Sequence, residues 1–154
     1  MFKNKALLFI FLFALLIRII KSGAFPVGFH SDEVRVAWNA VSILKTGHDD
    51  KGNFLPLYYN TFGDFRPTGI FYTVIPSIIL FGKTEFAVRF PSALIGALTV
   101  IPLYLFVVEL TKNRKVGLLS CLFLAISPWH IDVSRATSEA TIAAFLTLFA
   151  LYYF

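Results

Sequence analysis

The chain has 154 residues, of which 57% are hydrophobic, 17% aromatic and only 15% charged. A soluble domain contains about 45–50% apolar residues, so this composition indicates a membrane protein rather than a soluble one. The net charge of +5 is explained by lysines and arginines beside apolar segments, and no continuous basic face indicates nucleic-acid binding. We therefore expect an all-α membrane protein, a polytopic bundle of transmembrane helices.

The first apolar segment, at about 6–21, follows Lys3 and Lys5 and ends at Lys21. We interpret it as an uncleaved span rather than a signal peptide, because no pair of small residues marks a cleavage site after it. Further spans are predicted at about 88–108, 116–134 and 139–154. The apolar segment 69–82 contains Pro76 and is shorter than the roughly 20 residues that a span needs, so it is predicted to be an interfacial helix.

The basic segment 109–115 and the basic N-terminus are both predicted to be cytoplasmic, which requires an even number of crossings between them. Residues 22–87 then form one long external loop that carries interfacial helices at about 32–45 and 69–82. The last apolar segment is shorter than a full span, so we expect 1–154 to be the N-terminal part of a longer chain. Cys121 is the single cysteine and lies in an apolar segment, which predicts a packing role.

The helix predicted at 32–45 follows Ser31 and ends before Gly47, a typical C-terminal cap. At helical spacing, its apolar side carries Val34, Ala37, Trp38, Val41 and Leu44, and its polar side carries Asp32, Arg35, Asn39 and Ser42. The adjacent acids Asp32 and Glu33 have two interpretations. They complement the positive end of the helix dipole, or one of them acts as a general base at a membrane cavity.

The segment Gly47-His48-Asp49-Asp50-Lys51-Gly52-Asn53 is rich in acids and turn formers. A turn is favoured over a calcium site, because the spacing of an EF-hand loop is absent. A divalent ion held by Glu139 or Asp132 together with His130 or His48 is an alternative. These residues have no fixed metal-ligand spacing, so no metal site is assigned.

Arginines mark two further segments. Arg66 precedes Pro67 next to the predicted interfacial helix, where its planar fork of donors suits a lipid-linked phosphate. The alternative is that Arg66 reaches membrane headgroups. Arg135 and Glu139 are four residues apart and are predicted to pair on one helical face. In a transporter or channel, the second competing class of protein, they would line the solute path.

Several of these segments, taken in order, resemble the membrane-embedded C-type glycosyltransferases that use polyprenyl-phosphate sugars. The resemblance is to protein O-mannosyltransferases and lipid A aminoarabinose transferases. It rests on Asp32-Glu33 after the first span, Phe-Arg-Pro at 65–67, Glu-Phe-Ala-Val-Arg-Phe-Pro-Ser-Ala-Leu at 85–94, and Ser-Pro at 127–128 followed by an arginine and an acid. Arg66 stands where lysine is common in the aminoarabinose branch, which leaves the branch open.

The resemblance implies transfer of a sugar, with inversion, from a polyprenyl-phosphate donor in the membrane lipid to an unidentified acceptor on the non-cytoplasmic face. It also implies roles for particular residues. The implied catalytic acids are Asp32, as general base, with Glu33 and Glu139. The implied contacts to the donor phosphate are Arg66, Arg135 and Arg35. Residues with acceptor-binding or supporting roles are His30, Asn39, His130 and Asp132. An inert membrane scaffold is the third alternative.

Overall fold

The structure is a computed structural model that describes residues 5–25, 27–61 and 63–154. Within these residues the chain is mostly helical and divides into two compact units. The first unit contains the residues up to Ile20, Ser92–Ala136 and Ala140–Phe154, and the second contains Lys21–Pro91 and Thr137–Glu139. Lys3, on which the predicted orientation of the N-terminus partly rests, lies outside the described residues.

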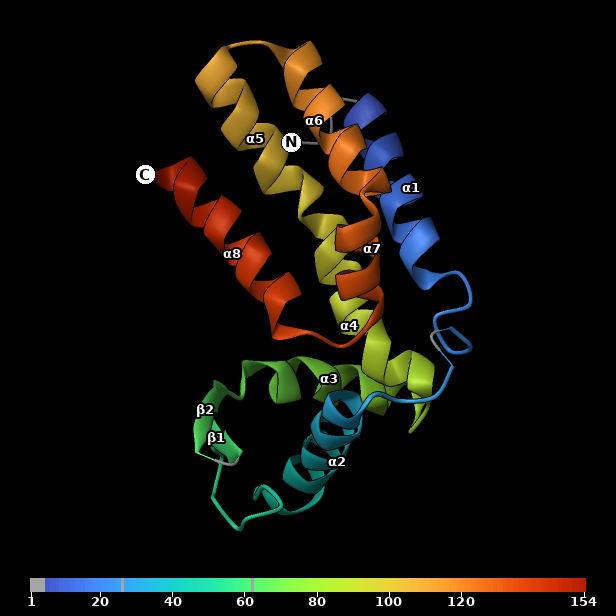
Figure 1. The fold of residues 1–154 in the computed structure, drawn as a ribbon, viewed down its shortest axis with the longest axis vertical. Helices are drawn as coiled ribbons and strands as arrows, with labels where there is room; N and C mark the ends of the chain where they lie inside the picture. The colour runs from blue at the N-terminus through green and yellow to red at the C-terminus, as the bar shows by residue number, and fades with distance from the viewer. Residues whose placement is uncertain (1–4, 26, 62) are drawn as a thin grey trace. The chain divides into compact units, whose positions relative to one another are not determined.

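The first unit consists of helices. They are α1 (Lys5–Ile19), the second half of α4 (Glu85–Leu98), α5 (Val100–Thr111), α6 (Arg114–Ile126), α7 (Pro128–Arg135) and most of α8 (Glu139–Tyr153). Figure 1 shows α5 and α6 side by side, with α1 along α6. Small side chains fill much of the buried core, which lets helices approach closely. They are Ala14, Ala97, Cys121 and Ala125, and the packing role predicted for Cys121 is confirmed.

A bend separates α6 from α7, so the span predicted at 116–134 is not one straight helix. The two helices meet at 57°. The break follows from Ser127, whose backbone is extended, and from Pro128, which lacks an N–H and begins α7. Arg18 is fully buried beside the bend and donates hydrogen bonds to the carbonyl of Ala125 (3.2 Å) and to the hydroxyl of Ser134 (2.9 Å).

Hydropathy and helix length single out one membrane-crossing candidate among the described residues. It is the continuous helix Glu85–Thr111, and the bent pair formed by α6 and α7 is a second candidate if it counts as one span. The predicted span at 88–108 lies inside the first of these helices. The helices α1 and α8 occupy the segments predicted as spans at 6–21 and 139–154, and their membrane crossing stays a prediction.

The second unit is built from α2 (Ser31–Thr46), α3 (Gly69–Phe81) and the start of α4. The helix α2 begins with a capping box formed by His30 and Glu33, and it ends at Gly47 in the left-handed region (φ 75°), as its sequence predicts for the C-terminal cap. Its packing face differs from the predicted stripe. Val36, Ala40 and Ile43 are the buried apolar residues, whereas Val34, Trp38 and Leu44 are exposed.

A small sheet modifies the all-helical expectation. Strands β1 (Tyr58–Thr61) and β2 (Asp64–Pro67) pair antiparallel, with Tyr59 opposite Arg66. The aromatic content of this segment suits strands, but its sequence was not assigned to a sheet. The turn predicted at 47–53 is confirmed. The carboxylate of Asp49 accepts hydrogen bonds from the backbone N–H of Lys51 (3.0 Å) and Asn53 (2.8 Å), as Asp does in tight turns.

Gly96 provides a test of the packing between α4 and α7. A Cβ atom added there would lie 2.4 Å from the Cβ of Ser134. Overpacking costs about 1–3 kcal/mol, which exceeds the roughly 1 kcal/mol that alanine gains over glycine in a helix. We expect Gly96→Ala to lower the thermal unfolding midpoint of the purified protein by roughly 2–6 °C. Gly69→Ala is the matched control, since its Cβ would meet open space, and an equal loss in both variants would contradict the packing described.

Candidate active site

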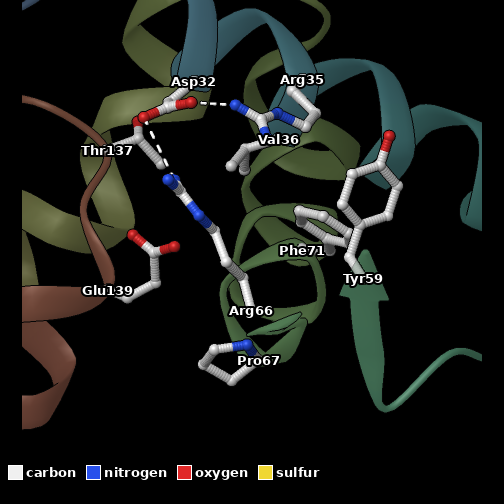
Figure 2. A pocket seen from close by; sticks show the side chains of 9 residues that line it. All are labelled: Asp32, Arg35, Val36, Tyr59, Arg66, Pro67, Phe71, Thr137 and Glu139. Atoms are coloured by element: carbon white, nitrogen blue, oxygen red, sulfur yellow. Dashed lines mark hydrogen bonds and ion pairs between the residues drawn. The ribbon is translucent and has the colours of Figure 1, made fainter. Parts of the chain in front are cut away.

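One pocket of the second unit gathers charged side chains from distant parts of the sequence. The charged side chains come from α2, from β2 and from the first residue of α8, as Figure 2 shows. Uncharged lining residues come also from β1, from α3 and from the segment that precedes α8. The residues that line the pocket are Asp32, Arg35, Val36, Tyr59, Arg66, Pro67, Phe71, Thr137 and Glu139. Four of the residues that the sequence singled out, namely Asp32, Arg35, Arg66 and Glu139, therefore lie in one place.

Asp32 is the acceptor at the centre of this pocket. Its two carboxylate oxygens pair with different guanidinium groups, one with Arg35 on the next turn of α2 and one with Arg66 on β2 at 3.4 Å. A carboxylate has about four lone-pair sites, so these two contacts leave acceptor capacity. The side chains of Asp32 and Arg66 are 43% and 40% exposed, so both groups are accessible from outside the protein.

Arg35 is held in position by its neighbours. It donates a 2.6 Å hydrogen bond to the hydroxyl of Thr61, and its guanidinium lies over the ring of Tyr59 at 5.9 Å from the ring centre. The hydroxyl of Tyr59 donates to the carboxylate of Asp50 at 2.9 Å. Burial and this hydrogen bond to Asp50 raise the pKa of Tyr59, so the phenol stays neutral at ordinary pH.

Arg66 extends from β2 across the pocket between Asp32 and Glu139, as Figure 2 shows. It also donates to the carboxylate of Asp64 at 3.0 Å. The hydrogen bond to Asp64 and the charge of Asp32 raise the pKa of Arg66 above its ordinary value, so its charge is permanent. Glu139 is the first residue of α8, and its carboxylate forms no ion pair within the described part of the chain.

Glu33 is adjacent to Asp32 in sequence but does not line the pocket. Its side chain is buried and pairs with Arg89, which is also fully buried. The guanidinium meets the carboxylate in a two-bond fork, with Nε 2.9 Å from Oε1 and Nη2 3.0 Å from Oε2. Such a bidentate pair is among the stronger ionic hydrogen-bond arrangements in proteins.

Backbone groups complete the surroundings of this ion pair. The Glu33 carboxylate accepts the N–H of His30 at 3.1 Å and the N–H of Thr137 at 3.2 Å. Arg89 donates to the carbonyls of Ser22 (2.9 Å) and Gly28 (2.5 Å). Burial alone would raise the pKa of Glu33, but the hydrogen bonds from Arg89, His30 and Thr137 outweigh it and keep the pKa below its ordinary value.

Three predicted site residues, Arg135, His130 and Asp132, belong to α7 in the first unit, outside this pocket. Arg135 donates to the carbonyl of Ile17 at 2.8 Å, and His130 is buried with its Nδ1 2.8 Å from Arg18. The prediction that Arg135 and Glu139 lie on one helical face is wrong, because α7 ends at Arg135 and Ala136 is extended.

The two remaining predicted residues have supporting positions on α2. His30 is the N-cap, and its Nδ1 lies 3.4 Å from the backbone nitrogen of Asp32. Asn39 is fully buried, donates to the carbonyl of Arg35 at 3.0 Å and accepts the N–H of Asp50 at 3.0 Å. Both residues therefore shape the helix and the turn that carry the pocket.

The residues considered as metal ligands are not brought together. Residues 5–25, 27–61 and 63–154 contain no cluster of three or more His, Cys, Asp or Glu side chains that could hold an ion. His48 bonds locally, with its Nδ1 2.8 Å from the carbonyl of Thr46. No metal role is therefore assigned to the pocket residues.

Arg89 and Thr137 were not predicted as site residues. Arg89 lies in the segment 85–94 that carries part of the family resemblance. A single arginine in an otherwise apolar helix is costly unless it has a buried partner, so its position in this segment could have indicated a buried ion pair. Thr137 contributes a backbone N–H, and no side-chain pattern in the sequence marks such a group.

Comparison with known proteins places the chain in a family context. The profile of a family described as dolichyl-phosphate-mannose-protein mannosyltransferase matches residues 66–154. This range includes Arg66, Arg89 and Glu139. No curated protein and no solved structure matches the chain significantly.

The lowered pKa of Glu33 makes the stability of the fold pH-dependent. Since the folded pKa lies below the ordinary value of 4.5, the ion pair stabilises the folded state above about pH 4.5, and this stabilisation is lost as the pH falls through the folded pKa. Leaving Arg89 buried without its partner costs roughly 3–5 kcal/mol. We expect Glu33→Gln to unfold more easily at pH 7 and to lose less stability than the wild type on acidification below pH 4.5.

The measurement is the unfolding midpoint of each protein across the acid range. Glu109→Gln is the matched control, because Glu109 forms an exposed ion pair with Lys112. Exposed pairs contribute about 0–1 kcal/mol, so the control should follow the wild type closely. Parallel pH curves for Glu33→Gln and the wild type would contradict the assignment.

Proposed function

We propose that this chain, which belongs to the dolichyl-phosphate-mannose-protein mannosyltransferase family of C-type membrane glycosyltransferases, provides the site at which a lipid-linked sugar is transferred. The donor is a polyprenyl-phosphate sugar, with mannose favoured by the family description, and the acceptor is a hydroxyl group. The transfer inverts the anomeric carbon. The observation that supports this proposal best is the gathering of Asp32, Arg35, Arg66 and Glu139 in one pocket.

Asp32 acts as the general base in this proposal. The acceptor oxygen attacks the anomeric carbon as the bond between that carbon and the phosphate oxygen breaks. The acceptor proton passes to the carboxylate of Asp32, and the lipid phosphate leaves with the bonding electrons. General-base catalysis contributes about 10²–10⁴-fold in rate when the base lies within hydrogen-bond reach. The exposure of Asp32 supports this role, whereas Glu33 is buried in its ion pair.

Arg66 and Arg35 bind the donor phosphate. A guanidinium presents a planar fork that matches phosphate oxygens, and it stabilises the charge that develops on the leaving group. Arg66 now contacts two carboxylates, Asp32 and Asp64. A phosphate arriving at Arg66 competes with the 3.4 Å contact to Asp32, so donor binding frees an oxygen of the base.

Glu139 supplies the second acidic group of the site. Its carboxylate lies beside the Arg66 side chain, whose guanidinium points toward Asp32, as Figure 2 shows. A carboxylate without an ion-pair partner accepts hydrogen bonds from sugar or acceptor hydroxyls. Glu139 therefore orients the reacting groups, while Asp32 takes the proton.

The membrane topology proposed for this function has four spans, at about 6–21, 88–108, 116–134 and 139–154. The residues 22–87 then form an external loop, and the pocket opens on the non-cytoplasmic side. The basic segment at 109–115 supports this orientation. The donor lipid reaches the pocket from the bilayer, and a protein acceptor fits the family description.

Replacement of Asp32 tests the base. We expect Asp32→Asn to lower kcat by about 10²–10⁴-fold without weakening donor binding, because the amide cannot take the proton and competes less than the carboxylate for Arg66. The measurement is consumption of polyprenyl-phosphate mannose by the enzyme in lipid vesicles, with donor binding measured separately. Glu109→Gln, an exposed acid paired with Lys112, is the control and should retain wild-type turnover.

A fully active Asp32→Asn enzyme would exclude Asp32 as the base. Failure of the wild type to consume any lipid-linked sugar, combined with solute or ion flux in the same vesicles, would support a transporter instead.

Replacement of Arg66 by lysine tests the phosphate contact. Lysine keeps the charge but loses the fork, so we expect KM for the lipid donor to rise about tenfold, equivalent to roughly 1.4 kcal/mol. Arg114→Lys is the matched control, since Arg114 is exposed at the start of α6 in the first unit. An unchanged KM in Arg66→Lys, measured in the same vesicle assay, would argue that Arg66 does not touch the donor.

A further inference from the structure

The structure assigns to Glu33 a role that differs from that of a catalytic acid. We propose that Glu33 is a positioning residue that fixes the separation of Asp32 and Glu139 across the pocket. This inference rests on the proposed function, since it concerns how the base Asp32 and the orienting carboxylate of Glu139 are held. It is carried by the hydrogen bonds that the Glu33 carboxylate accepts from three separate segments of the chain.

The carboxylate of Glu33 has no acceptor capacity to spare. Arg89 Nε and the N–H of Thr137 donate to Oε1 at 2.9 and 3.2 Å. Arg89 Nη2 and the N–H of His30 donate to Oε2 at 3.0 and 3.1 Å. These four bonds occupy about all the lone-pair sites of a carboxylate. Glu33 therefore cannot take a substrate proton without losing a bond that holds the fold.

The first of these segments is the start of α2, which carries Asp32. Consecutive residues on an α-helix point about 100° apart, so a Glu33 side chain directed into the protein leaves Asp32 directed toward the pocket. The bond from the N–H of His30 to Glu33 closes the capping box and fixes the first turn. The position of Asp32 is thus set by its buried neighbour.

The second segment is the one that carries Glu139. Thr137 lies between α7 and α8, so its N–H has no acceptor within a helix. It donates instead to the carboxylate of Glu33. The hydroxyl of Thr137 donates to the carbonyl of Val88 at 3.1 Å. Thr137 is buried and lies two residues before Glu139. Its two bonds fix where α8 begins and hence where Glu139 enters the pocket.

A carboxylate is the group that this position requires. All the groups that contact the Glu33 oxygens are donors, so the NH2 group of a glutamine would face one of them and leave it unsatisfied. Aspartate keeps the charge but is one methylene shorter. The shorter carboxylate can contact the guanidinium of Arg89 or the N–H of Thr137, but it cannot reach both at the distances that Glu33 does. The expected order of activity is therefore wild type, then Glu33→Asp, then Glu33→Gln.

A double-mutant cycle between Glu33 and Glu139 tests the proposal in the intact enzyme in lipid vesicles. Misplacement of a catalytic group by about 1 Å costs roughly 10²-fold in rate, so we expect Glu33→Gln to lower kcat by about that factor at nearly constant KM for the donor. Because Glu33 acts partly through Glu139, the same change in a Glu139→Gln background should lower kcat by a clearly smaller factor than in the wild-type background, since coupled residues are not additive.

Glu85→Gln is the matched control. Glu85 also pairs with Arg89, at 3.4 Å, but its carboxylate is partly exposed and lies outside the pocket. It should change kcat by less than about threefold. Rates are expressed per molecule that binds donor, so a loss of folded protein does not count as a loss of kcat. If Glu33→Gln does not fold, the same cycle is measured with Glu33→Asp, for which we expect a smaller loss of kcat.

Additive effects of the Glu33 and Glu139 replacements would overturn the positioning role, as would a Glu33→Gln enzyme with wild-type kcat. Either result leaves the proposed function standing if Asp32→Asn is inactive. A fully active Asp32→Asn enzyme overturns the proposed function instead, so the two failures are distinguishable.

Discussion

The buried ion pair between Glu33 and Arg89 is the constraint on which the second unit depends. A fully buried guanidinium is tolerated only when its charge and its N–H groups are satisfied, and here a carboxylate and two backbone carbonyls satisfy them. The ion pair joins α2 to α4, the two carbonyls belong to the segment before α2, and the N–H of Thr137, before α8, donates to Glu33. The pair therefore holds together parts of the chain that local helix formation would leave independent.

The adjacent acids Asp32 and Glu33 have opposite environments, and this difference follows from helix geometry. Glu33 is buried with four hydrogen bonds, whereas Asp32 is 43% exposed and contacts two guanidinium groups at the pocket. A general base must be accessible to the substrate, as proposed for Asp32. A charged group that stabilises the fold must be buried with all its hydrogen bonds formed, as Glu33 is. One helical step separates these two requirements, which explains why two acids in a row serve different ends.

Local patterns in the sequence predicted the helix α2, its glycine cap, the turn at Asp49 and the residue types of the pocket. The packing face that they predicted for α2 is wrong, because both faces carry apolar residues and the choice depends on α3. The role of Arg89 was not predicted, because hydrophobic periodicity describes a single helix and gives no information on its partner Glu33, which is distant in the sequence. The helical face predicted to carry both Arg135 and Glu139 was wrong for a related reason, since the prediction assumed an unbroken helix through Ala136.

The charge balance of the pocket connects its resting geometry to its proposed chemistry. Asp32 and Glu139 line the pocket together with Arg35 and Arg66, and Asp64 pairs with Arg66 from outside the lining, so the arginines have anionic neighbours within the protein itself. In the proposed mechanism, an incoming phosphate brings further negative charge and displaces a carboxylate from Arg66. The displaced group with the longest contact is Asp32, at 3.4 Å compared with 3.0 Å for Asp64. In the proposed mechanism, donor binding therefore releases an oxygen of the base, and the buried Glu33 keeps Asp32 in place when the contact between Asp32 and Arg66 is broken.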